Sequence, residues 1–383
     1  MVLALAGCGS HSSEATATSA SPPQNSATPQ ASEPPVTATA PMAGPGLIEL
    51  HCIDGYQPMQ LLRIDPATGA TLGQESVPWT FNSPLGAVTV DNYTCVPPPD
   101  APTQLEAREL FSQDFTKIMV TSAQQSDGSA HVGYVTIATG NFTDLTPAVT
   151  TSGGFGATVP VLSSPMFDAT TDHRWFTDTD AGSIYDCSSD TTCRAAVANP
   201  GRPLTGKLVD VLHGVWQLPA QPGFGWPALS PSAALMVSSG AGSGFGGGLV
   251  ITRTDHYASM INNDVHGAVV TSGGQEKGSF CATWLTETSM LAEDSQDNSL
   301  YYVNGVKEGM SGQVTASMAL PANKSQNISY MASPDSTHFA FLSTAPGATI
   351  TDIYTEAVGS NPPASPTKVG EAGSANDKLL AWQ

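Results

Sequence analysis

One stretch near the end of the chain decides the fold: Ala332-Ser333-Pro334-Asp335-Ser336-Thr337-His338-Phe339-Ala340-Phe341-Leu342-Ser343. Ser333-Pro334-Asp335-Ser336 predicts a tight turn, because proline fixes φ and the side chains of Asp and Ser bond to nearby backbone groups. Phe339 and Phe341 then alternate with smaller residues, with the period of two that is typical of a strand packed on both faces. A glycine-containing loop and the apolar pair Ile353-Tyr354 follow. The stretch therefore predicts a turn, a strand, a loop and a second strand.

Weaker copies of this phrase recur at intervals of about 50–60 residues, and self-similarity at such a period is typical of propellers and solenoids. In each copy a turn leads into a first apolar strand, and a second apolar strand follows. The first strands are expected at Ile118–Ser122, Arg174–Asp178, Leu235–Ser238 and Met290–Glu293. The second strands are expected at Gly133–Ala138, Ser183–Tyr185, Leu249–Arg253 and Leu300–Val303.

A sixth copy is incomplete. It begins at Ala372 and reaches Leu379–Trp382, with no second strand after it. Leu47–Cys52 and Gln60–Gly69 have the character of second strands but no first strand before them. Joining the two ends would complete a sixth blade and close the ring, which removes the exposed edge that an open sheet would leave.

The Ser333-Pro334-Asp335 phrase with Phe339-Ala340-Phe341, together with the Asp65-Pro66-Ala67-Thr68-Gly69 turn, resembles the WD40-like repeats of TolB-like β-propellers. The resemblance covers residues 47–383, although only Ser333–Ser343 matches closely. It implies an all-β domain, a propeller of six blades in which N- and C-terminal strands close the ring. A seven-bladed ring or a pair of β-sandwiches is the alternative.

The composition fits short strands joined by many turns and disfavours nucleic acid as a partner. Of 383 residues, 37 are Gly, 30 are Pro and only 12% are charged. The formal charge of −20 would repel phosphate backbones and anionic lipid headgroups. The simplest interpretation of this charge is solubility of a secreted protein that is poor in Lys, rather than a dedicated cation-binding role.

The first residues resemble the lipobox of bacterial lipoproteins, since Leu5-Ala6-Gly7-Cys8 is followed by Gly9-Ser10. The resemblance implies that the signal peptide before Cys8 is removed, that Cys8 is the lipid attachment site, and that the protein lies on the extracytoplasmic face of the cell membrane. No Lys or Arg precedes Cys8, so residues 1–8 are expected to be a truncated signal segment with the true translation start further upstream.

Residues 9–46 are expected to be a disordered linker. They are nearly all Ser, Thr, Ala, Pro and Gln and cannot bury enough surface to offset the ordering entropy. As a flexible chain the linker would span roughly 30–40 Å, which lets the domain stand clear of the membrane. No run of 18 or more apolar residues occurs, so the lipid on Cys8 would be the membrane anchor.

The other five cysteines predict two disulfides, which an exported chain permits. Cys187 and Cys193 enclose a small polar loop without the histidines or the spacing of a zinc knuckle. Cys52 and Cys95 bracket the N-terminal strands, and a bond between them would pin the segment that closes the ring. Because five is odd, Cys281 is expected to be a buried thiol.

No motif in the sequence predicts a catalytic group, a metal site or a cofactor. Gly242–Gly247 satisfies G-x-G-x-x-G but precedes the strand-like Leu249–Thr252 rather than a helix, so a loop is expected. Asp294–Asn298 lacks the glycine and the distant glutamate of a calcium loop and is interpreted as a solvated turn. His213 and His338 are interpreted as packed or surface residues. No G-x-S-x-G elbow occurs.

Three functions remain open. The first is a cell-envelope module that binds a protein or a wall glycan, which is also what the resemblance to TolB-like propellers implies. The second is a propeller enzyme, a hydrolase or lyase of sugars or lactones, with a site at the central channel. Its candidate residues are interpreted more readily as parts of repeat turns: Asp114, Asp168, Glu287 and Asp335. The third is a purely structural spacer of the cell wall.

Replacing Cys8 tests the anchor. In a chain carried behind a complete lipoprotein signal peptide, we expect Cys8→Ser to prevent acylation and to move the protein from the membrane fraction to the aqueous phase of a detergent partition. Cys281→Ser is the control and should leave the partition unchanged. A Cys8→Ser protein that stayed in the membrane fraction would contradict the lipobox interpretation.

Overall fold

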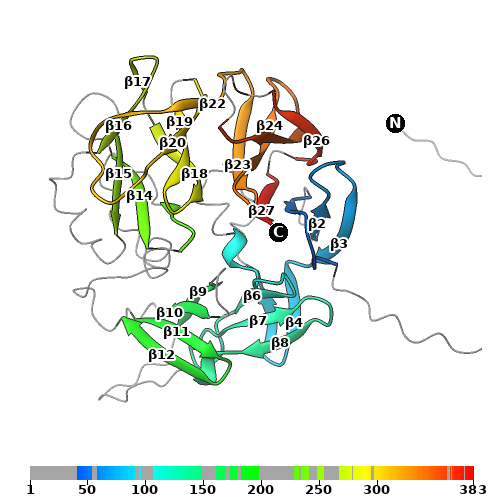
Figure 1. Cartoon of the computed structure of the whole chain (residues 1–383). Helices are drawn as coiled ribbons and strands as arrows, with labels where there is room; N and C mark the ends of the chain where they lie inside the picture. The colour runs from blue at the N-terminus through cyan, green and yellow to red at the C-terminus, as the bar shows by residue number, and fades with distance from the viewer. Residues whose placement is uncertain are drawn as a thin grey trace, which may run out of the picture. The chain divides into compact units, whose positions relative to one another are not determined.

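The computed structural model describes residues 41–383, apart from residues 54–57, 91–94, 96–106, 149–160, 169–172, 179–182, 198–227, 233, 241–247, 254–266, 278, 295–296, 360–362, 364 and 375. The described residues belong to one unit, Ala40–Gln383. Their strands form six sheets of a β-propeller, so the prediction of an all-β fold is confirmed. We number the sheets from blade 1, which contains β4, along the chain to blade 6, which contains both the first and the last strand (Figure 1).

Blades 1 to 3 carry four, five or six strands each. Blade 1 contains β4 (Thr80–Ser83), β5 (Gly86–Thr89), β6 (Lys117–Ser122), β7 (Val132–Thr136) and β8 (Asn141–Asp144), followed by the 3-10 helix η2 (Thr146–Ala148). Blade 2 contains β9 (Leu162–Phe167), β10 (Arg174–Asp178), β11 (Ser183–Ser189) and β12 (Thr192–Val197). Blade 3 contains β13 (Ala228–Leu229), β14 (Leu235–Gly240), β15 (Gly248–Arg253), β16 (Ala268–Ser272), β17 (Gln275–Lys277) and β21 (Gly312–Thr315).

Blades 4 to 6 carry four strands each. Blade 4 contains β18 (Ser279–Thr286), β19 (Ser289–Asp294), β20 (Leu300–Asn304) and β22 (Ser317–Leu320). Blade 5 contains β23 (Gln326–Ala332), β24 (His338–Thr344), β25 (Thr351–Ala357) and β26 (Thr367–Glu371). Blade 6 contains β27 (Lys378–Trp382), β1 (Leu47–His51), β2 (Met59–Ile64) and β3 (Thr71–Val77).

Blade 6 joins the two ends of the described chain, as the sequence predicts. The last strand, β27, pairs antiparallel with β1, and Leu47 lies opposite Trp382 (Figure 1, red beside blue). Gly46 and Gln383 extend the pairing, since each backbone N–H donates to the other residue's carbonyl oxygen, at 3.0 and 2.9 Å. The terminal strands therefore close the propeller.

The stretch that decides the fold packs on two neighbouring blades. Phe339 and Phe341 on β24 contact the apolar cluster that blade 4 contributes, whereas Ala340 and Leu342 contact a cluster that contains Leu47 of blade 6. Because successive strand side chains point to opposite faces, the large residues fill one interface and the smaller residues fill the other. This confirms the prediction of a strand packed on both faces.

The turn that leads into β6, β10, β14 and β24 is the most regular local feature. In four blades the backbone N–H at the start of the turn donates to the carbonyl oxygen five residues later: Ser112 to Lys117, Asp168 to His173, Ser230 to Leu235, and Ser333 to His338. Blade 4 replaces this turn by a shorter one between Thr286 and Ser289. The recurrence explains why the repeat could be recognised in the sequence although the letters vary.

Residues just before Leu47, the boundary expected from the sequence, also pack against the fold. Met42 is 2% exposed and packs in the core, and Arg63 donates from Nε to the Pro41 oxygen and from Nη1 to the Pro45 oxygen, both at 3.1 Å. One methionine is the sole large apolar side chain in residues 41–46, so composition did not separate this segment from the linker. Cys8 and residues 9–40 lie outside the described residues.

Both disulfides expected from the sequence are present, Cys52–Cys95 and Cys187–Cys193. Cys281 is a free thiol, and the residue is half-buried. Desolvation raises the pKa of the thiol above its usual value. Gly242–Gly247 and His213 lie outside the described residues. No helix that is long and apolar enough to cross a membrane occurs in the part of the chain that the structure describes.

Removing each disulfide in turn tests how much it stabilises the fold. This bond spans 43 residues and Cys187–Cys193 spans 6, and a longer loop gains more from a cross-link because it restricts the unfolded chain more. We expect Cys52→Ser/Cys95→Ser to lower the free energy of unfolding by about 4 kcal/mol and Cys187→Ser/Cys193→Ser by about 2 kcal/mol. Urea titration with tryptophan fluorescence measures both. Equal losses would contradict the expected dependence on loop length.

Candidate functional site

Two of the four carboxylates proposed from the sequence serve their own turns. Asp335 Oδ1 accepts hydrogen bonds from Ser333 Oγ at 2.7 Å and from the Thr337 N–H and Oγ1 at 3.1 and 2.8 Å. Asp114 Oδ1 accepts the equivalent three bonds, from Ser112 Oγ and from the Thr116 N–H and Oγ1. These carboxylates therefore hold turns, as the sequence interpretation favoured.

The hydrogen bonds also explain the acidity of the two groups. The bond from Ser333, followed by those from Thr337, lowers the pKa of Asp335 to about 2. Partial burial raises the pKa of Asp114, but the bonds from Ser112 and Thr116 outweigh it and hold the pKa below its usual value. Both side chains thus stay ionised and bound to their turns at neutral pH.

The other two proposed carboxylates lie in different blades. Glu287 of blade 4 accepts the Ser232 N–H through Oε1 and so ties a turn of blade 4 to a turn of blade 3. Asp168 of blade 2 is buried, and its charge acts on the Arg108 guanidinium together with the charges of Glu109 and Asp114. Desolvation lowers the pKa of Arg108 to about 10 against these charges. The four carboxylates do not converge on one site.

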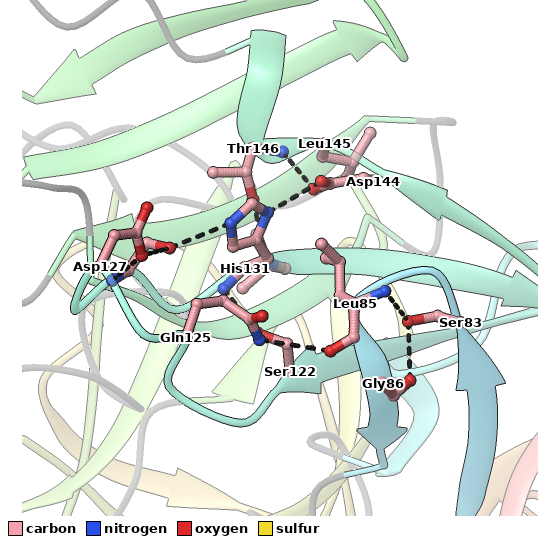
Figure 2. A network of polar contacts seen from close by, with 12 residues as sticks. Ser83, Leu85, Gly86, Ser122, Gln125, Asp127, His131, Asp144, Leu145 and Thr146 are labelled. Carbon is pink, nitrogen blue, oxygen red and sulfur yellow. Dashed lines mark hydrogen bonds and ion pairs between the residues drawn. The ribbon is translucent and has the colours of Figure 1, made fainter.

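A Ser-His-Asp arrangement that the sequence did not reveal lies in blade 1. His131 Nδ1 is 2.8 Å from Asp144 Oδ2, and His131 Nε2 is 3.1 Å from Ser129 Oγ. Figure 2 shows the His131 ring between Asp144 on one side and the turn of Asp127 on the other. In geometry this is the order nucleophile, base and orienting carboxylate that defines a hydrolytic triad.

The serine of this arrangement is placed to brace strands rather than to attack a substrate. Ser129 is 3% exposed, and its Oγ donates to Asp127 Oδ1 at 2.7 Å, a shorter contact than that to His131. Asp144 is also engaged, because its Oδ1 accepts the Thr146 N–H at 2.9 Å. A hydroxyl has one proton to donate. The network therefore fixes the β6–β7 turn to the end of β8.

The same His-Asp pair recurs in blade 2, where His173 Nδ1 is 2.7 Å from Asp186 Oδ1. In both blades the aspartate lies 13 residues after the histidine. In both, the strand residue opposite the aspartate stands two positions after the histidine: Gly133 in blade 1 and Trp175 in blade 2. This His-x12-Asp spacing is the signal in the sequence that could have found the pairs.

A third His-Asp pair lies where the ring closes and includes a second carboxylate. His51 Nδ1 is 2.9 Å from Asp377 Oδ2, and Glu49 lies two residues before His51 on β1. One ligand-type atom of each residue lies within 4.8 Å of the others. We call these three residues the closure cluster. Ile48 and Leu50 pack toward blade 1, so the alternation of the strand directs Glu49 toward blade 5.

Asp377 is satisfied in this cluster, and Glu49 is not. Asp377 Oδ1 accepts the Cys52 N–H at 2.8 Å and Ser374 Oγ at 2.9 Å, and its Oδ2 accepts the Ser374 N–H at 2.9 Å. Glu49 is fully buried, and neither of its carboxylate oxygens has a hydrogen-bond partner. A buried carboxylate without partners is costly, so Glu49 stands out among the apolar residues Leu47, Ile48 and Leu50 of β1.

Electrostatics follow from this geometry. Burial, and then the negative charge of Asp377, raises the pKa of Glu49 well above its usual value. The hydrogen bond to Asp377 raises the pKa of His51, against the opposing effect of partial burial. In the closure cluster, Glu49 therefore favours its neutral form.

The histidine ring of the closure cluster rests on a glycine. A Cβ at Gly373 would lie 2.2 Å from His51 Cε1. Gly373 also has a φ angle of +100°, a backbone conformation that residues with a side chain rarely adopt. A glycine at this position therefore lets the ring approach the backbone and face Asp377.

No protein-family model and no curated protein sequence matches this chain. Several solved structures are similar to it. TolB from Acinetobacter baumannii shares 10% identity at a TM-score of 0.38, over 89% of this chain and 68% of TolB. An oligogalacturonate lyase from Vibrio parahaemolyticus shares 10% identity at a TM-score of 0.36, over 82% of this chain and 72% of the lyase. An oligogalacturonate lyase in complex with manganese shares 10% identity at a TM-score of 0.36, over 86% of this chain and 75% of that lyase. The function has to be argued from this chain's own residues.

Replacing Asp377 tests the closure cluster. We expect Asp377→Asn to lower the free energy of unfolding by about 3–5 kcal/mol, because it removes the charge from a buried hydrogen-bonded pair. Asp144→Asn is the matched control, since it changes a similar pair whose carboxylate is 23% exposed, and about 1 kcal/mol is expected. Urea titration at pH 6 measures both.

The loss should also depend on pH. Because Asp377 raises the pKa of His51, the stabilisation is complete below the unfolded value near 6.5 and disappears as pH rises through the folded value. The loss from Asp377→Asn is therefore expected to be smaller at pH 8 than at pH 6. A loss that is independent of pH would show that the His51 pair does not contribute.

Proposed function

We propose that the chain is a lipid-anchored, extracytoplasmic binding module of the cell envelope, in which the propeller presents loops to a protein or to a cell-wall glycan. The observation that carries the proposal is the closure of the ring in blade 6. Strand pairing between β27 and β1 joins the two ends of the described chain, and the Cys52–Cys95 bond pins the segment that follows β1. Binding sites are commonly formed by loops on a rigid scaffold.

The cysteines support the proposed location. Disulfides persist in oxidising compartments outside the cytoplasm, and two are formed in this chain. Cys8, in its lipobox-like context, would supply the anchor, and residues 9–40 would supply much of the tether. The charge of −20 would keep the domain away from anionic headgroups. These features favour a protein or a glycan, rather than the lipid surface, as the binding partner of the propeller.

The use of polar groups inside the fold supports binding over catalysis. Asp114 and Asp335 accept bonds from their own turns, and Glu287 holds a turn of the neighbouring blade. Function must be argued from a site rather than from the fold. The polar clusters described here are placed to stabilise turns and strand pairs.

The second candidate is a hydrolase or lyase of sugars or lactones, and the geometry of Ser129, His131 and Asp144 is the observation that favours it. Rotation of the Ser129 hydroxyl from Asp127 to His131 would be needed for nucleophilic attack. Burial of Ser129 opposes access of a substrate. The binding module is therefore the better supported function.

Cross-linking in the intact envelope tests the proposal. The full chain, carried behind a complete lipoprotein signal peptide, is cross-linked in living cells, and the adducts are separated into protein and glycan by mass spectrometry. We expect one partner to be enriched, to be competed by excess purified chain, and to be at least tenfold depleted with Cys8→Ser, because loss of the anchor removes the local concentration.

A hydrolase assay on the same preparation provides the contrast. Wild type and Ser129→Ala are compared on lactone, ester and uronide substrates. Turnover that Ser129→Ala abolishes, without a competed partner, would overturn the binding module in favour of the enzyme. Equal background rates together with a competed partner would support it.

A further inference from the structure

Glu49 is the feature that the proposed function does not use. It is 0% exposed, lies among Leu47, Ile48 and Leu50 on β1, and has no hydrogen-bond partner on either oxygen. Burial of an unpartnered carboxylate costs several kcal/mol unless the group is neutralised or coordinates a cation. A carboxylate oxygen of Glu49 lies within 4.8 Å of a possible metal-ligand atom of His51 and of one of Asp377.

We propose that Glu49, His51 and Asp377 bind one divalent transition-metal ion at the closure of the ring. This inference goes beyond the proposed function and does not depend on it. The three residues are the only such group in the part of the chain that the structure describes. Two carboxylates would balance the charge of a divalent ion and give Glu49 the partner that it lacks.

The spacing of the cluster fits shared coordination. Ligands at about 2.1 Å from one ion and at right angles lie about 3 Å apart. His51 Nδ1 and Asp377 Oδ2, at 2.9 Å, already have this separation. The Glu49 oxygen lies within 4.8 Å of both and would approach the ion by rotation of its side chain. Binding through Nδ1 would release the proton that this nitrogen shares with Asp377.

The surroundings hold two of the ligands in place. The Cys52 N–H and Ser374 Oγ fix the other oxygen of Asp377, and the backbone at Gly373 supports the His51 ring. Such outer contacts orient metal ligands in proteins. The His51 side chain is 25% exposed, whereas Asp377 is fully buried. An ion would therefore enter past His51 and would complete its coordination with water.

The donor set selects the kind of ion. Imidazole with two carboxylates suits Zn²⁺, Mn²⁺ and Fe²⁺, whereas Ca²⁺ and Mg²⁺ prefer oxygen ligands alone. The ion would connect β1 with the residue that precedes β27, which are the two ends of the ring. Because the ion would bind the folded state and not the unfolded chain, it is expected to raise the stability of the folded state.

Metal binding by matched variants tests the site. The full chain is purified without a histidine tag, with both disulfides formed, and is freed of metal with a chelator. Equilibrium dialysis with Mn²⁺ and with Zn²⁺ is expected to give one ion per chain for wild type, and binding at least tenfold weaker for Glu49→Gln. Ca²⁺ is expected to bind at least tenfold more weakly than Mn²⁺.

Glu356→Gln is the matched control. Glu356 on β25 is 3% exposed and also has no partner on either oxygen, but it belongs to no such group among the described residues. Its replacement should leave metal binding and the rise in melting temperature on adding Mn²⁺ unchanged, whereas Glu49→Gln should remove that rise. Circular dichroism establishes that both variants are folded.

Three results would overturn the site. A folded wild-type chain that binds no ion at millimolar concentration would show that Glu49 is simply a neutral buried acid. Binding that Glu49→Gln leaves unchanged would place the ion elsewhere in the chain. Equal affinity for Ca²⁺ and Mn²⁺ would exclude a role for the imidazole of His51.

Discussion

Strand pairing between β27 and β1 is the interaction on which the other blades depend. It joins residues that are more than 320 positions apart, such as Leu47 and Trp382. A propeller without this pairing would leave an unpaired strand edge on each side of the gap. Because the loop that closes is so long, its entropy cost is high, and the pairing is supported by contacts that strands alone would not need. These contacts are the extension at Gly46 and Gln383, the buried Asp377 and the Cys52–Cys95 bond.

Hydrogen bonding inside the blades follows a small set of repeated solutions. A serine opens the turn, an aspartate two residues later accepts its hydroxyl, and a threonine donates from both its backbone and side chain, in blade 1 and again in blade 5. Phe115 and Ser336 occupy the same position of this turn, with φ near +57° and +58°. The turn has the same geometry although this position holds different residues. Its conformation therefore depends on the aspartate acceptor and on the Ser and Thr donors rather than on the residue at this position.

Buried acids give the unit a definite response to pH. Burial raises the pKa of Glu293 to about 7, against the effect of the hydrogen bond from Tyr330, and raises the pKa of Glu356 to about 7. Their contribution to stability is complete below the unfolded value near 4.5 and is lost as pH rises through about 7. In Glu49 the same tendency is reinforced by Asp377. A bound cation would remove this disadvantage in the closure cluster alone.

The repeat, the two strands that follow each repeat turn and the blade that joins both ends were predictable from the sequence. Alternation at Phe339 and Phe341, and the turn at Ser333–Asp335, are local signals that follow from the period of a strand and from turn chemistry. The sequence also indicated both cysteine pairs. Tertiary structure alone decided the polar sites, because Ser129 and Asp144, or Glu49 and Asp377, become neighbours only through strand register. Met42 likewise acquired its place in the core from packing that composition does not encode.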